Sequence, residues 1–161
     1  MTPAVRALER ARVAHRVLAY AHDPAAPAYG LEAAQALGLD PAHVFKTLVV
    51  RLEGGPRAGA LAVALVPADR QLDVRALAHA LGAKRADLAD PAAAERATGY
   101  VVGGISPLGQ RRALATVLDA DALALPELYV SGGRRGLELA LAPADLARLT
   151  AAATAPIARA P

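Results

Sequence analysis

The amino-acid sequence predicts an α+β protein with a mixed sheet. Polar or acidic N-cap residues precede apolar positions at helical spacing, which indicates several short helices. Runs of β-branched residues bounded by glycine-rich turns indicate strands between them. Both turns and helices connect these strands, so regular strand–helix alternation is absent and a doubly wound sheet is not expected. At 161 residues the chain is long enough to bury one hydrophobic core.

The first part of the chain carries clear boundary signals. Thr2 followed by Pro3 is typical of a helix start, and two prolines within 21–29 interrupt both periods. The glycine-rich segment 54–59 between two apolar runs predicts a hairpin. The elements expected up to residue 66 are a helix over 3–13, a strand over 15–20, a loop over 21–29, a helix over 31–37 ended by Gly38, a capped turn at Asp40-Pro41, and strands over 45–52 and 61–66.

The rest of the chain changes character at Thr98. Two aspartate-capped helices come first, and then seven of the thirteen glycines lie between Gly99 and Gly136, which predicts short strands joined by tight turns. The elements expected here are helices over 73–81 and 90–97, strands over 100–102, 114–118, 128–131 and 136–141, and a helix over 143–152. After the helix over 143–152 we expect a loosely held, alanine-rich tail. No repeat or linker divides the chain, so we expect a single domain over 1–161.

Composition excludes several classes of site. Without cysteine there is no thiol nucleophile, zinc ribbon or disulfide. The four histidines lack metal-ligand spacing, so we expect no metal and no cofactor. The net charge of +3 permits a polyanionic partner without requiring one. The N-terminus is amphipathic, unlike a signal peptide, and no apolar run reaches the ~20 residues of a membrane span, so we expect a cytoplasmic protein with no membrane partner.

Scarce residues are informative in this sequence. Sixteen of the eighteen basic positions are arginine, and the only lysines are Lys46 and Lys84. A retained lysine can mark a place where a compact ammonium group is needed, and chance retention is an equal alternative for each one. The only serines are Ser106 and Ser131, and both lie in the glycine-rich part.

Two glycine-rich segments, 98–109 and 129–136, contain these serines. Neither is a Walker loop or a dinucleotide-binding fingerprint. They allow the backbone to approach a ligand closely, or they form ordinary tight turns; the sequence leaves both open. An arginine pair comes shortly after the glycines of each segment and would lie at a site rim or on a solvated surface: Arg111-Arg112, just beyond the first segment, and Arg134-Arg135, near the end of the second. No Ser-His-Asp triad can be assembled, and the carboxylate pairs Asp87/Asp90 and Asp119/Asp121 are expected to be caps and solvated turns.

Several motifs in one order suggest a family. They are Tyr20-Ala21-His22-Asp23-Pro24, Phe45-Lys46-Thr47-Leu48, Ala89-Asp90-Pro91, Thr98-Gly99-Tyr100, Gly103-Gly104-Ile105-Ser106-Pro107-Leu108-Gly109-Gln110 and Tyr129-Val130-Ser131-Gly132-Gly133. With them the chain resembles, nearly end to end, the YbaK/EbsC family of free-standing aminoacyl-tRNA editing proteins. These are relatives of the editing domain inserted into bacterial prolyl-tRNA synthetases.

The resemblance implies a fold and a site. The expected fold is a curved, mixed or mostly antiparallel sheet around a small pocket, with helices packed outside. Lys46 would hold the terminal adenosine or the acyl ester of the tRNA end. The other implied pocket residues are Tyr20, Tyr29, Thr47, Gly103, Gly104, Ser106, Ser131 and Gly132. Tyr29 stands where many relatives carry phenylalanine, and Glu138 stands where an acidic or small polar residue is usual.

The resemblance also implies an activity, the removal of cysteine from mischarged Cys-tRNA(Pro). The substrate's own thiol would attack its ester, which fits a chain without a cysteine of its own. The alternatives are a deacylase for another small aminoacyl group, such as alanine or serine, and a non-catalytic module that binds the tRNA end or a synthetase. The expected partners are the aminoacylated tRNA 3′ end and prolyl-tRNA synthetase, and no DNA.

Overall fold

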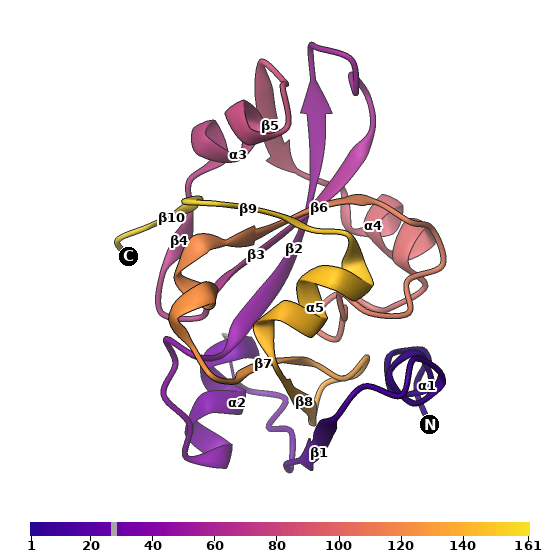
Figure 1. Ribbon diagram of the computed structural model, residues 1–161, viewed down its shortest axis with the longest axis vertical. Helices are drawn as coiled ribbons and strands as arrows, with labels where there is room; N and C mark the ends of the chain where they lie inside the picture. Colours follow the sequence, from indigo (N-terminus) through magenta and orange to yellow (C-terminus); the bar gives the residue numbers. More distant parts are fainter. Residues whose placement is uncertain (27–28) are drawn as a thin grey trace.

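The computed structural model describes residues 1–26 and 29–161. In these residues the α+β fold class is confirmed, with helices packed around mixed and antiparallel sheets (Figure 1). The elements in chain order are α1 (Pro3–Arg10), β1 (His15–Ala19), α2 (Tyr29–Leu37), β2 (Phe45–Glu53), β3 (Leu61–Pro67), β4 (Gln71–Leu72), α3 (Val74–Ala80), β5 (Arg85–Leu88), α4 (Pro91–Thr98), β6 (Ala115–Asp119), the 3-10 helix η1 (Ala120–Ala124), β7 (Leu128–Ser131), β8 (Leu137–Leu141), α5 (Pro143–Thr150), β9 (Ala153–Ala155) and β10 (Ala158–Arg159).

The largest sheet has five strands in the order β5-β2-β3-β6-β9. The predicted hairpin of β2 and β3 is antiparallel, whereas β6 runs parallel to β3. Successive side chains of a strand point to opposite faces, so Val49 belongs to one core cluster and Val50 to another. The sheet therefore has a buried apolar core on both faces.

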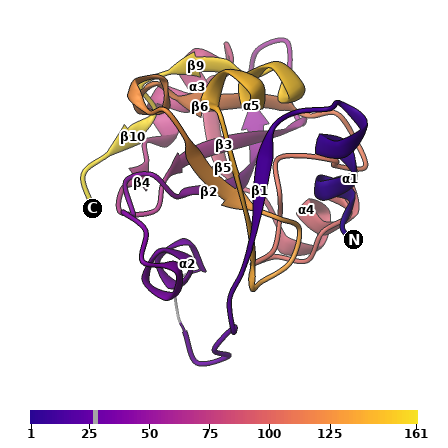
Figure 2. The same ribbon diagram turned by 60° about the horizontal axis from the view of Figure 1, so that its bottom comes forward.

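The two faces are covered differently. The antiparallel sheet β1-β8-β7 and residues of α1, α4 and α5 share a core with one face. Helix α3 and Ile157 pack on the other face. Figure 2 shows β1 crossing in front of the five-stranded sheet, with the two termini on opposite sides of the molecule.

The predicted helix starts are confirmed by their caps. Thr2 Oγ1 accepts a hydrogen bond from Val5 N, and the carboxylates of Asp73 and Asp90 accept from Ala76 N and Ala93 N. Helix α2 begins two residues earlier than expected, at Tyr29. The loop expected over 21–29 is found at 21–26, and Pro27 and Ala28 lie outside the described residues.

The prediction of a strand over 100–102 is wrong. Gly99 and Gly103 have φ values of 80° and 97°, and these left-handed conformations turn the chain on either side of it. Tyr100 is buried and its hydroxyl donates to the Leu108 carbonyl at 2.6 Å, so the segment is an internally bonded loop.

The prediction of a loosely held tail after α5 is also wrong. Strand β9 pairs with β6, and β10 pairs with β4. One oxygen of the buried Asp119 carboxylate accepts hydrogen bonds from Ile157 N and Ala158 N, at 2.9 and 3.0 Å. Asp119 is therefore a buried anchor rather than a solvated turn residue, while its other oxygen caps η1 through Asp121 N, as expected of a cap.

Short polar strands left no clear signal in the sequence. β4 and β5 were not expected, because two to four residues are too few to show an alternating pattern. In residues 1–26 and 29–161 no helix has the length and apolar character that a membrane span requires.

Candidate functional site

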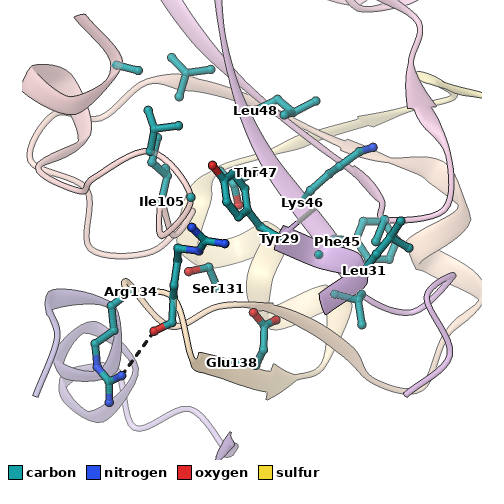
Figure 3. A pocket seen from close by; sticks show the side chains of 18 of the residues that line it. Tyr29, Leu31, Phe45, Lys46, Thr47, Leu48, Ile105, Ser131, Arg134 and Glu138 are labelled. Carbon is teal, nitrogen blue, oxygen red and sulfur yellow. Dashed lines mark hydrogen bonds between the residues drawn. The ribbon is translucent and has the colours of Figure 1, made fainter. Parts of the chain in front are cut away.

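A cavity of about 480 Å³ lies where α2, β2, the glycine-rich loop after α4 and the β7–β8 hairpin meet (Figure 3). Its wall is largely apolar, with a few polar groups. The lining residues are Tyr20, Tyr29, Gly30, Leu31, Val44, Phe45, Lys46, Thr47, Leu48, Val49, Ala68, Leu88, Ala89, Pro91, Ala94, Val102, Gly103, Ile105, Ser131, Arg134, Arg135 and Glu138. Apolar walls with a few convergent polar groups are typical of small-molecule sites.

Six of the nine site residues expected from the sequence line this cavity. They come from β2, from the ends of β1, α2 and β7, and from the glycine-rich loop, which are distant in sequence and adjacent in space. These six are Tyr20, Tyr29, Lys46, Thr47, Gly103 and Ser131.

Gly104, Ser106 and Gly132 are not part of the cavity wall. Ser106 is fully buried, and its hydroxyl accepts a hydrogen bond from Leu108 N. The amide of Gly132 donates to Leu137 O, and a Cβ on Gly104 would lie 2.7 Å from the Arg134 Cα. Ser106 and Gly132 thus stabilise the turns of their own segments, whereas Gly104 is where the two glycine-rich segments approach each other closely.

Lys46 lies at one end of the cavity. Its Nζ donates to the Arg70 carbonyl at 2.6 Å, which uses one of the three ammonium donors. Burial lowers the pKa of Lys46, and the charge of Asp69 opposes that shift. In Figure 3 the side chain points away from Ser131 and Glu138, so the ammonium group and the Glu138 carboxyl lie at different parts of the cavity.

The backbone of Gly103 lies close to the side chains of Tyr29 and Arg135, which stack on each other. The guanidinium of Arg135 lies 4.2 Å from the centre of the Tyr29 ring. A Cβ on Gly103 would lie 3.1 Å from Tyr29 Cζ and 3.2 Å from Arg135 Cδ, so a side chain there would push into the pair. Arg135 also donates to Ala26 O at 3.4 Å and lies 4.0 Å from a carboxylate oxygen of Glu32.

Three buried side-chain atoms in the described residues have no hydrogen-bond partner. They are Thr47 Oγ1, Arg135 Nε and Glu138 Oε2, and all three residues line the cavity. Buried polar groups are nearly always paired, so the clustering of these exceptions indicates that the cavity accommodates a polar ligand.

The structure also brings in residues whose role the sequence left open. Arg134 and Arg135 line the cavity, which agrees with the expectation of a site rim, whereas Arg111 and Arg112 are exposed and do not line it.

Glu138 also lines the cavity. It is 6% exposed, and desolvation raises its pKa to about 8. A single acidic residue in an otherwise apolar β8 was the available sequence signal. No cluster of three or more potential metal ligands occurs in residues 1–26 and 29–161.

Comparison with known proteins assigns the family. The family model described as "Aminoacyl-tRNA editing domain" matches residues 24–149, which is most of the chain. The chain belongs to the aminoacyl-tRNA editing domain family. The expected resemblance is confirmed, and the match contains every residue of the cavity wall except Tyr20.

Individual editing-domain relatives agree with this assignment. A protein of Enterococcus faecalis named "Putative Cys-tRNA(Pro)/Cys-tRNA(Cys) deacylase EbsC" is 36% identical over 118 residues, covering 73% of this chain and 69% of that protein. A proline–tRNA ligase of Desulforamulus reducens is 30% identical over 108 residues, covering 67% of this chain but only 18% of the ligase.

The fold of the editing domain is also found in a solved structure. A crystal structure described as "a putative trans-editing enzyme for prolyl tRNA synthetase" superimposes with a TM-score of 0.80 at 28% identity, covering 99% of both chains. The sheets and helices around the cavity are thus those of the editing-domain fold.

Proposed function

We propose that this protein is a trans-editing deacylase that removes cysteine from mischarged Cys-tRNA(Pro). The observation that carries the proposal is a cavity of about 480 Å³ whose described wall contains no cysteine or histidine. Ser131 is there, but no histidine base lines the wall beside it, and its hydroxyl already accepts a hydrogen bond from Gly133 N. The name of the Enterococcus faecalis relative supports cysteine as the substrate's acyl group.

A substrate with its own nucleophile suits such a cavity. The cysteine thiolate attacks the carbonyl carbon of its own ester, the bond to the tRNA ribose oxygen breaks, and that oxygen leaves with the thiol proton. The product is a strained cyclic thioester, which water opens to free cysteine. Well-positioned intramolecular reactions reach effective molarities of about 10⁵–10⁸ M, so positioning alone supplies much of the acceleration. With a reference pKa of about 8.5, a thiol is already a few per cent thiolate at neutral pH.

The part of the cavity at Lys46 is suited to the tRNA end. Two of the ammonium donors of Lys46 remain after its hydrogen bond to Arg70 O. We place the terminal ribose or ester oxygen at Lys46, where the positive charge stabilises the charge that develops on the leaving oxygen. The aminoacyl part then lies toward Thr47, Ser131 and Glu138.

Recognition of the tRNA body needs a further partner. A net charge of +3 gives only a weak electrostatic term for binding a polyanion. We propose that prolyl-tRNA synthetase presents the mischarged tRNA, in keeping with the match to part of a proline–tRNA ligase. Co-purification of the two proteins at moderate salt tests this, and no association at any salt concentration would contradict it.

A comparison of three substrates tests the activity. We expect release of labelled cysteine from Cys-tRNA(Pro) to be at least about 100-fold faster than release of serine or alanine, because a hydroxyl is a far poorer nucleophile than a thiol and a methyl group is none. Comparable turnover of all three would instead indicate an activated water and a broader deacylase. Binding of tRNA without any turnover at enzyme excess would indicate a non-catalytic module.

The role of Lys46 is tested in the same assay. We expect Lys46→Ala to lower the rate by about 100-fold or more, as removal of a group that stabilises developing charge does. Lys84→Ala is the matched control, because Lys84 is exposed and lies outside the cavity wall. Full activity of Lys46→Ala would contradict the assignment.

A further inference from the structure

Glu138 is the acidic side chain in the cavity wall, and the Lys46 side chain points away from it (Figure 3). It lies in β8, whose other four residues are all apolar and buried, and its register partners are Leu18 on β1 and Ser131 on β7. It is 6% exposed, and its Oε2 atom has no hydrogen-bond partner. A buried carboxyl without a partner costs free energy, so its place in the cavity wall indicates that a ligand group completes it.

The charged and titratable groups that share the cavity do not pair with Glu138. Lys46 on β2 is bound to the Arg70 carbonyl. Arg135 lies over Tyr29 and reaches toward Ala26 and Glu32 on the α2 side. Tyr20 and Arg134 also line the wall, yet no ion pair in the described residues includes Glu138. With no ion pair to offset it, desolvation raises the pKa of this carboxyl to about 8.

We propose that Glu138 binds the free α-ammonium group of the aminoacyl ester and loses its own proton to solvent as the substrate enters. The carboxyl group is neutral in the empty cavity at pH 7; on binding, its O–H bond breaks, the proton goes to water, and the carboxylate pairs with the substrate's ammonium group. An ammonium group supplies both the hydrogen bond that Oε2 lacks and the charge that stabilises its ionised form.

This pairing would let the cavity distinguish a free amino group from a blocked one, which the size of the amino-acid side chain cannot do. An ester whose amino group is acylated is neutral there and cannot stabilise the ionised carboxylate. Aminoacyl-tRNA with a blocked amino group, including peptidyl-tRNA, would therefore be excluded. Glu138 is a positioning residue in this scheme: it fixes one substituent of the substrate's Cα, so that the thiol and the ester carbonyl are left in defined directions.

The inference rests on the proposed function, and a binding measurement separates the two. The probe is cysteine joined through an amide to 3′-amino-3′-deoxyadenosine, which cannot be deacylated, and its N-acetyl form is the matched ligand. Calorimetric titrations at pH 6.5 in two buffers of different ionisation enthalpy count the protons released. The variants are Glu138→Gln, which keeps the shape of the side chain without its charge, and the control Glu127→Gln, whose carboxylate pairs with Arg16 outside the cavity.

For the natural chain we expect release of about one proton per ligand and binding of the free-amino probe about 30-fold tighter than its N-acetyl form. Glu138→Gln should release no proton and bind both forms within about twofold, and Glu127→Gln should behave like the natural chain. Carbon-13 spectra of the six glutamate carboxyls report the Glu138 titration directly, with a midpoint near pH 8 that falls by two or more pH units when the probe is bound.

Each result decides between the proposals. Equal proton release or equal amino preference in the natural chain and Glu138→Gln would overturn the inference. If Cys-tRNA(Pro) is deacylated without such a preference, the proposed function stands and the inference fails. If binding depends on Glu138 and the amino group but no deacylation occurs, the inference stands and the proposed function fails. Absence of binding of either probe at millimolar concentration would contradict both.

Discussion

Glu138 makes the stability of the fold depend on pH, because burial raises its pKa from an ordinary 4.5 to about 8. Its neutral form favours folding fully below pH 4.5, and this contribution is lost as the pH rises toward 8, at about 1.4 kcal/mol per pH unit. We expect Glu138→Gln to match the natural chain near pH 4.5 and to be more stable at pH 8, by on the order of 4 kcal/mol. Denaturant titrations at both pH values measure the difference.

Glu127→Gln is the control for that pH series. Glu127 pairs with Arg16 on the surface, and the hydrogen bond from Arg16 lowers the pKa of Glu127. Removing its carboxylate therefore cannot produce a stability gain that grows with pH. A difference between Glu138→Gln and the natural chain that stays the same at pH 5 and pH 8 would show that Glu138 is ionised in the folded protein.

The two serines, which look alike in the sequence, should behave differently when they are replaced. Ser106 is fully buried outside the cavity wall and its hydroxyl accepts a hydrogen bond from Leu108 N, whereas Ser131 lines the cavity. We expect Ser106→Ala to lower the free energy of unfolding by about 1 kcal/mol and to leave the deacylation rate within about twofold. Ser131→Ala should change the rate more than the stability. Urea unfolding and the deacylation assay on both variants test this, and the reverse pattern would contradict it.

Among single residues, the sequence was most informative about rare types and fixed motifs. Lys46, Thr47 and Gly103 belong to motifs that resemble the editing family, and all three line the cavity. Arg134 and Arg135 could not be told from Arg111 and Arg112, because a pair of arginines after a glycine-rich segment looks the same in both places. Only the return of β8 beside β7 brings Arg134 and Arg135 to the site.

At the scale of elements, Asp119 attaches the C-terminal strands to the central sheet. Its carboxylate accepts hydrogen bonds from Ile157 N and Ala158 N, and it is 2% exposed. We expect Asp119→Ala to lower the free energy of unfolding by about 3 kcal/mol, since one buried and one part-buried amide lose a charged acceptor. Amide exchange in β9 and β10 should become faster than in β2 and β3.

Asp121→Ala is the matched control for the tail. Asp121 is exposed, and its carboxylate pairs with Arg70 at the surface, so its loss should cost no more than about 1 kcal/mol. Protection of β9 and β10 that is unchanged in Asp119→Ala would show that strand pairing alone holds the tail.

For the molecule as a whole, we expect a single cooperative unfolding transition. The core clusters on the two faces of the large sheet share β2, β3 and β6, so neither can lose its packing without exposing the strands of the other. Scanning calorimetry should give equal calorimetric and van't Hoff enthalpies. Two resolved transitions would contradict the expectation of one domain over 1–161.

The sequence by itself determined the elements that local chemistry specifies. Capped helices, the β2–β3 hairpin and the α+β class follow from side chains within a few residues of one another, and the order of several motifs indicated the family. The tertiary structure alone decided the anchored tail, because the hydrogen bond from Ile157 N to Asp119 joins residues 38 positions apart. It also decided the loop at Tyr100, because that loop forms only with the Tyr100 side chain buried in the core. It also decided the raised pKa of Glu138, because desolvation on folding raises that pKa to about 8 and no local sequence pattern records burial.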